Sequence, residues 1–152
     1  MKALIQKVIH GKVMVEDECV GEIDAGYVVF LSVKKGDSKS DASYLADKTA
    51  ALRIFPDDNG RMNRSIMEKG GNILVVSQFT LHADTRKGNR PSFIMSALPD
   101  AAEKLYEHYV DCLRNIMGPD RIATGRFQAV MTVEIVNDGP VTIELKSRNE
   151  SF

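Results

Sequence analysis

The residues of this sequence best suited to chemistry stand directly after a short apolar run, Ile73–Val76. They are Ser77, Gln78, Phe79 and Thr80. An apolar run of this length indicates a buried strand, and a buried strand that ends in hydrogen-bonding groups is a common place for a binding site. The same spacing also fits an edge strand with ordinary polar alternation.

A hydroxyl nucleophile is one chemistry that this strand end could supply. Thr80 stands two residues before His82, and a neighbouring base can activate a Ser or Thr hydroxyl. Residues two apart share a face only while the strand stays regular. A Ser/Thr esterase acting on small substrates is therefore one interpretation of the segment.

A basic loop follows the strand end and carries Arg86, Lys87 and Arg90. From Arg61 to Arg90 there are six basic residues and two acidic ones, whereas the whole chain has a formal net charge of -1. We interpret this segment as an edge that binds phosphates. A solvated basic surface without a ligand is the alternative.

Other features of the sequence exclude several classes of site. It contains no G-x-S-x-G, H-E-x-x-H, P-loop or G-x-G-x-x-G pattern, and its two cysteines, Cys19 and Cys112, stand far apart. We therefore expect no cofactor, no metal and no disulfide framework. No apolar run reaches the roughly 20 residues of a membrane span, so we expect a protein of the reducing cytoplasm without membrane contact.

The elements that must position the strand end alternate between strand and helix patterns, and 152 residues fit a single domain, 1–152. We expect an antiparallel meander over Ala3–Phe30 with its last strand central, and helices over about Asp41–Arg53 and from Pro99 to the stop at Gly118-Pro119. Between them we expect a turn at Pro56–Gly60 and irregular chain over Arg61–Gly71. Alternation around Asn137–Pro140 predicts a β-hairpin, followed by a frayed tail over Ser147–Phe152.

Gly139-Pro140 is unusual inside a hairpin turn, because proline removes a backbone donor at the start of the next strand. A rigid loop that presents backbone carbonyls would suit shape discrimination. A proline that simply begins a strand is the alternative interpretation.

Several motifs taken together resemble the D-aminoacyl-tRNA deacylase family, in the same order along essentially the whole chain. They are Ser77–Leu81, Arg86–Gly88 with Arg90–Phe93, Thr124–Phe127 and Asn137–Thr142. The resemblance implies a three-layer α/β/β fold with mixed, largely antiparallel sheets and two main helices. It also implies hydrolysis of the ester that joins a D-amino acid, or misplaced glycine, to the 3′-terminal adenosine of tRNA.

The resemblance further implies a homodimer in which a cis Gly139-Pro140 pair reaches into the partner's site. Ser77, Gln78, Phe79 and Thr80 would form the catalytic pocket, largely through main-chain groups. Phe127 and Met131 match positions near the bound aminoacyl-adenosine. His82, Asn89 and Gln128 depart from the family pattern, where Tyr, Arg and Gly are common.

With no strong side-chain base in the sequence, we expect the substrate's ribose 2′-hydroxyl to assist the reaction and backbone N–H groups near Phe79 and Thr80 to stabilise the oxyanion. Gly139 and Pro140 would exclude an L side chain by collision. Arg86, Lys87 and Arg90 would bind tRNA phosphates. A non-catalytic RNA-binding module and the small-substrate esterase are the alternatives.

Overall fold

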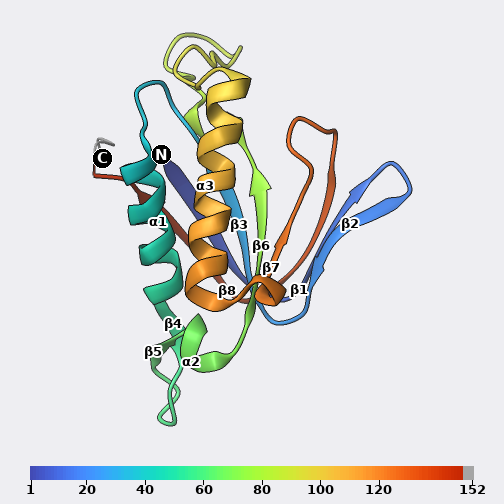
Figure 1. Cartoon of the computed structure of the whole chain (residues 1–152), viewed down its shortest axis with the longest axis vertical. Coiled ribbons are helices and arrows are strands. Elements are labelled where there is room, and N and C mark those ends of the chain that lie inside the picture. The colour runs from blue at the N-terminus through green and yellow to red at the C-terminus, as the bar shows by residue number, and fades with distance from the viewer. Residues whose placement is uncertain (149–152) are drawn as a thin grey trace.

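The computed structural model describes residues 1–148. Its main sheet has the order β2-β1-β3-β6-β7, and β8 pairs with the other edge of β1 (Figure 1). A separate hairpin is formed by β4 and β5. The elements in chain order are β1 (Lys2–Val15), β2 (Glu18–Ile23), β3 (Gly26–Ser32), α1 (Lys39–Ala51), β4 (Arg53–Pro56), β5 (Met62–Ser65), α2 (Ile66–Lys69), β6 (Asn72–Ser77), the 3₁₀ helix η1 (Phe79–His82), α3 (Pro99–Met117), the 3₁₀ helix η2 (Pro119–Arg121), β7 (Ile122–Thr124) and β8 (Thr132–Lys146).

The first half of the sheet is not a simple meander. β1 is 14 residues long, so its first half pairs with β3 and its second half pairs with β2. β3 therefore lies beside β1, and the predicted order of consecutive neighbours is wrong. The central place predicted for β3 is confirmed, because β3 also pairs in parallel with β6.

Two helices cover one face of the sheet, as predicted (Figure 1). α1 follows Ser38, whose backbone N–H donates to the Asp41 carboxylate at 3.0 Å, and α3 begins at Pro99. The hydroxyls of Thr49 and Tyr109 join the helices at 2.7 Å. Large side chains from both helices and from the sheet are fully buried between them, including Leu45, Tyr109, Leu113, Tyr27 and Ile73.

The opposite face of the sheet is also apolar. Val13, Val28 and Leu74 are fully buried there, and Val133 and Ile135 of β8 pack against them. The sheet thus curls so that β2 and β8 form a second β layer over its own strands. The predicted α/β class, with three layers and two main helices, is confirmed.

The predicted C-terminal hairpin is wrong. β8 is one strand of 15 residues that runs antiparallel to β1 throughout. The register passes from Thr142 opposite Gln6 to Asn137 opposite Val8, so residues 138–141 bulge out of the ladder. β1 is long enough to pair with both halves of the pattern, and a hairpin is therefore unnecessary. The Gly139-Pro140 peptide bond within this bulge is cis.

Two further expectations need correction. The segment Arg61–Gly71 is regular, because it contains β5 and the short α2, which ends at Gly70 with φ +76°. Ser147 is not frayed: its hydroxyl oxygen lies 2.8 Å from the Met1 amino group and its N–H donates to the Met1 carbonyl at 3.0 Å. The Arg148 guanidinium likewise lies 4.8 Å from the centre of the Tyr44 ring, and residues 149–152 of the expected tail lie outside the described residues.

Within residues 1–148, no helix combines the length and the apolar character that crossing a bilayer requires.

Candidate functional site

A cavity of about 530 Å³ opens where β6 ends. It lies between this strand end, the first turn of α3 and the segment that joins β7 to β8. The structure thereby brings Ser77, Gln78 and Phe79 together with Phe127 and Met131, although about fifty residues of chain separate the two groups. Further apolar side chains line the wall: Leu31 of β3, Val33 just after it, and Ala102 and Tyr106 of α3.

The chain leaves the sheet sharply at this strand end. β6 lies between β3 and β7, so the edge-strand interpretation is wrong. The Gln78 N–H donates to the Leu31 carbonyl at 2.8 Å, and η1 begins with Phe79. The first N–H groups of a helical turn have no acceptor within that turn, which leaves those of Phe79 and Thr80 available to a ligand.

Thr80 and His82 turn toward different partners. The Thr80 side chain is exposed, contacts the amide nitrogen of Gln78 and does not line the cavity. His82 is buried, with its Nδ1 at 2.6 Å from the Ser32 hydroxyl oxygen. The irregular η1 turn thus breaks the strand periodicity that could have placed both side chains on one face.

Phe127 packs against Tyr106, a residue of α3 that was not among the predicted site residues. The Tyr106 ring lies 5.7 Å from the Phe127 ring, and its hydroxyl donates to the Val75 carbonyl at 2.9 Å. Burial raises the pKa of Tyr106, so its hydroxyl stays a proton donor. A tyrosine on a buried helix face needs a hydrogen-bond partner, and this is the signal that could have identified it.

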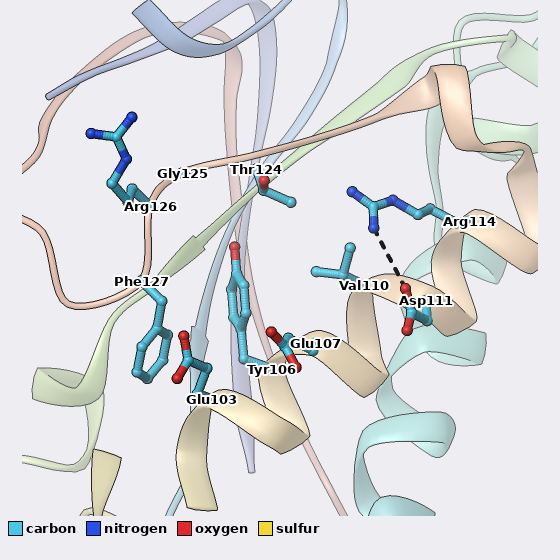
Figure 2. A pocket seen from close by; sticks show the side chains of 10 residues that line it. All are labelled: Glu103, Tyr106, Glu107, Val110, Asp111, Arg114, Thr124, Gly125, Arg126 and Phe127. Atoms are coloured by element: carbon cyan, nitrogen blue, oxygen red, sulfur yellow. Dashed lines mark hydrogen bonds and ion pairs between the residues drawn. The ribbon is translucent and has the colours of Figure 1, made fainter. Parts of the chain in front are cut away.

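Tyr106 and Phe127 also line a second cavity of about 480 Å³. Figure 2 shows Tyr106 rising from α3 toward Thr124, with Phe127 and Glu103 nearby. Carboxylates of α3 and the Arg126 side chain border this space. Arg126 pairs with Glu18 at 2.8 Å.

The segment after β7 approaches the cavity closely. The Gly125 N–H donates to the Val75 carbonyl at 2.9 Å, and a Cβ at Gly125 would lie 2.7 Å from the Met131 sulfur. Gln128 lines the first cavity with φ +58°, a conformation that glycine adopts without cost. Gln128 thus keeps a left-handed backbone conformation that the glycine common at this position in the resembled family would adopt more readily.

The basic loop lies beside the strand end and does not line the cavity. Backbone hydrogen bonds of 2.8 and 2.9 Å between Asp84 and Ser92 close it. Arg86 donates to both carboxylate oxygens of Asp84, at 2.9 and 2.7 Å, and holds the pKa of Asp84 at about 2. Lys87 and Arg90 are exposed.

Gly139 and Pro140 are exposed in the bulge of β8, and neither lines the cavity of its own chain. Among the residues described, no three His, Cys, Asp or Glu side chains gather as a metal ion would require. The site therefore consists of an apolar cavity, backbone groups at a strand end and a basic loop. Small-molecule sites in proteins commonly combine an apolar cavity with a few polar groups in this way.

Comparison with known proteins identifies the family to which this chain belongs. A family model described as D-Tyr-tRNA(Tyr) deacylase matches residues 4–146. A D-aminoacyl-tRNA deacylase of Heliobacterium modesticaldum is 53% identical over 148 residues, 97% of each chain. The chain belongs to this deacylase family, and its class is that of the hydrolases.

Two solved structures share the fold. One, named c-Myc DNA Unwinding Element Binding Protein, has a TM-score of 0.92 and 39% identity over 97% of this chain and 99% of its own. The other, described as a probable eukaryotic D-amino acid tRNA deacylase, has a TM-score of 0.81 and 17% identity, covering 95% of this chain and 97% of its own.

Proposed function

We propose that this protein hydrolyses the ester between a D-amino acid and the 3′-terminal adenosine of tRNA in the cytoplasm, and that it also removes misplaced glycine. The observation that carries this proposal is the cavity that joins Ser77–Phe79 to Phe127 and Met131, in a chain of the deacylase family. Its volume and apolar walls suit an adenosine with a small acyl group.

The proposed active unit is a homodimer in which Gly139 and Pro140 complete the partner's cavity. Both residues are exposed on a bulge, as a contributed loop must be. Large apolar side chains around the cavity are also exposed, with Phe79 at 56%, Ile94 at 72% and Leu98 at 72%. A second subunit would cover such a surface.

The enzyme would select the D enantiomer of the aminoacyl group by sterically excluding the L enantiomer. The carbonyl groups of Gly139 and Pro140 would occupy the space that an L side chain needs and leave room for hydrogen, which accounts for hydrolysis of a glycyl ester. Collision is an effective basis for rejection, because one favourable contact distinguishes substrates by only about 1–3 kcal/mol.

In the proposed chemistry the ester carbonyl lies at the strand end, where the N–H groups of Phe79 and Thr80 donate to the developing oxyanion. The adjacent ribose 2′-hydroxyl assists or activates the attacking water. Thr80 is an unsuitable nucleophile, because its exposed hydroxyl contacts an amide nitrogen that supplies no base.

The decisive experiment compares two changes with D-tyrosyl-tRNA as substrate. Thr80→Ala should retain most of the activity, whereas a 2′-deoxy terminal adenosine should abolish it. The reverse pattern would establish a threonine nucleophile. Binding of tRNA without cleavage would favour an RNA-binding module, and cleavage of a small aminoacyl ester without tRNA would favour a simple esterase.

Arg86, Lys87 and Arg90 would contact phosphates of the tRNA. Their exposure on a closed loop beside the strand end supports this role. Because Arg86 is already paired with Asp84, Lys87 and Arg90 would supply most of the attraction.

A further inference from the structure

The carbonyl oxygen of Phe79 accepts hydrogen bonds from two serine hydroxyls. Ser32, at the end of β3, donates at 3.3 Å, and Ser96, just before α3, donates at 3.2 Å. Ser32 is 1% exposed, so water competes little for its hydroxyl, whereas Ser96 is half-buried and its hydrogen bond to Phe79 lies at the surface. Two donors from distant parts of the chain thus converge on a single peptide group.

These donors are themselves firmly placed. Lys34 and Ser96 form a β-bridge, and the Ala97 N–H donates to the Val33 carbonyl at 3.0 Å. The loop that carries Ser96 is therefore tied to the chain just beyond Ser32. The Gln78 N–H, bonded to the Leu31 carbonyl, ties the strand end to the same segment.

The direction of the Phe79 carbonyl determines the direction of another group. A trans peptide is planar and carries its C=O and N–H on opposite sides, so the Phe79 carbonyl and the Thr80 N–H point in opposite directions. Hydroxyls that hold the carbonyl on one side thereby aim the N–H at the other. A fixed donor is more effective than a mobile one, because it needs no reorganisation during the reaction.

We propose that Ser32 and Ser96 are positioning residues that orient the Phe79–Thr80 peptide group toward the oxyanion of the ester. This inference rests on the proposed deacylase function and specifies how its main-chain donor is kept in place. Neither serine touches the reacting atoms in this scheme. Both act through the peptide group.

His82 affects the direction in which the Ser32 hydroxyl donates its single proton. The Ser32 hydroxyl has one proton, and its oxygen also lies 2.6 Å from Nδ1 of His82. If that proton goes to the Phe79 carbonyl, the hydrogen bond with His82 must be donated by the ring nitrogen. The imidazole then carries hydrogen on Nδ1, and the buried His82 keeps the Ser32 hydroxyl turned toward Phe79.

Steady-state hydrolysis of D-tyrosyl-tRNA by the full chain tests this inference. Ser32→Ala and Ser96→Ala should each lower kcat by about tenfold, less than the loss of a complete oxyanion donor, and leave KM within about twofold. Ser96→Thr, which keeps a hydroxyl, should recover most of kcat. Ser92→Ala, which removes a hydroxyl from the same loop, should match the wild type.

The His82 step has its own pair of variants. His82→Asn can place an amide donor where Nδ1 lies and should keep kcat close to wild type, whereas His82→Leu should reduce it as Ser32→Ala does. Thermal unfolding of each variant reports folding separately. Because Ser96 is only half-buried, Ser96→Ala keeps the test valid if a substitution at Ser32 prevents folding.

The outcomes separate this inference from the proposed function. An active wild type with an unchanged kcat in Ser96→Ala overturns the positioning role alone. A raised KM with unchanged kcat also overturns it, because it would assign the hydroxyl to substrate binding. A wild type that does not cleave D-tyrosyl-tRNA overturns both proposals.

Discussion

The Lys7 ammonium lies 2.8 Å from the Asp138 carboxylate, at the point where β8 changes its register along β1. Lys7 sits between Gln6, which faces Thr142, and Val8, which faces Asn137. The ion pair thus joins the straight strand to the first residue of the bulge that carries Gly139 and Pro140. We infer that it holds this bulge in the position from which it would exclude an L side chain.

Lys7→Met should remove the ion pair with Asp138 while keeping the apolar part of the side chain, so that the bulge is less firmly fixed. Asp138 is 44% exposed, so the pair contributes less than about 1 kcal/mol. We expect the ratio of kcat/KM for L-tyrosyl-tRNA to that for D-tyrosyl-tRNA to rise by no more than about fivefold. Lys12→Met on the same strand is the control, and an equal rise there would contradict the role of Lys7.

Gly139→Ala should disturb the bulge more strongly. Gly139 has φ +127°, and an added Cβ would lie 2.9 Å from a methyl carbon of Val141. The strain of about 1–2 kcal/mol should displace the loop, so that D/L discrimination and dimer formation both decrease. Gly36→Ala, with φ +88° and open space around it, carries similar strain away from the site.

Deacylation of both tyrosyl-tRNA enantiomers, together with sedimentation of each variant, measures the two effects of Gly139→Ala. Retention of full discrimination by Gly139→Ala would show that the bulge does not select chirality.

Asp84→Asn should strengthen tRNA binding, because it releases the Arg86 guanidinium from its two-point contact. Arg86→Ala should have little effect on affinity. Lys87→Ala and Arg90→Ala should each weaken binding and reduce the salt dependence by about one unit of slope. Filter binding over a range of salt concentrations tests this, and equal losses for all three basic residues would contradict the pairing argument.

The effect of Asp84→Asn should not vary between about pH 5 and pH 8. The hydrogen bond from Arg86 lowers the pKa of Asp84 to about 2. A lowered folded-state pKa means that the pair is fully formed above the unfolded value of about 4 and is lost only as the pH falls toward 2. A change in the affinity ratio within the neutral range would indicate that another group titrates at the loop.

Asp37→Asn should destabilise the fold by about 1–3 kcal/mol, because it removes a buried hydrogen-bonded carboxylate from the Met1 ammonium, which keeps its attraction to the buried Asp41 carboxylate. The Met1 amino group lies 2.8 Å from Asp37 Oδ1, and both side chains are fully buried. Asp58→Asn, whose carboxylate pairs with Arg64 but is 86% exposed, should cost less than about 1 kcal/mol. Urea unfolding of the two variants measures the difference, and similar midpoints would refute it.

Local patterns in the sequence were sufficient for much of the fold. Three of these patterns depend only on neighbours within a few residues. They are the apolar face of α3 between Pro99 and Gly118, the capping pair Ser38 and Asp41 before α1, and the apolar run before Ser77. The motifs that resemble the deacylase family are also local, and they indicated Phe127 and Met131 before any geometry was known.

Tertiary structure alone decided the pairing of β8 and the network behind Phe79. The alternation on either side of Gly139-Pro140 is the same for a hairpin and for one long strand, and only the 14-residue edge of β1 distinguishes the two. Ser32, Ser96 and His82 carry no shared motif, because a hydrogen bond depends on distance in space and not on spacing along the chain. The sequence by itself determined which residues are candidates for the site, and the folded sheet decided which side chains hydrogen-bond to them.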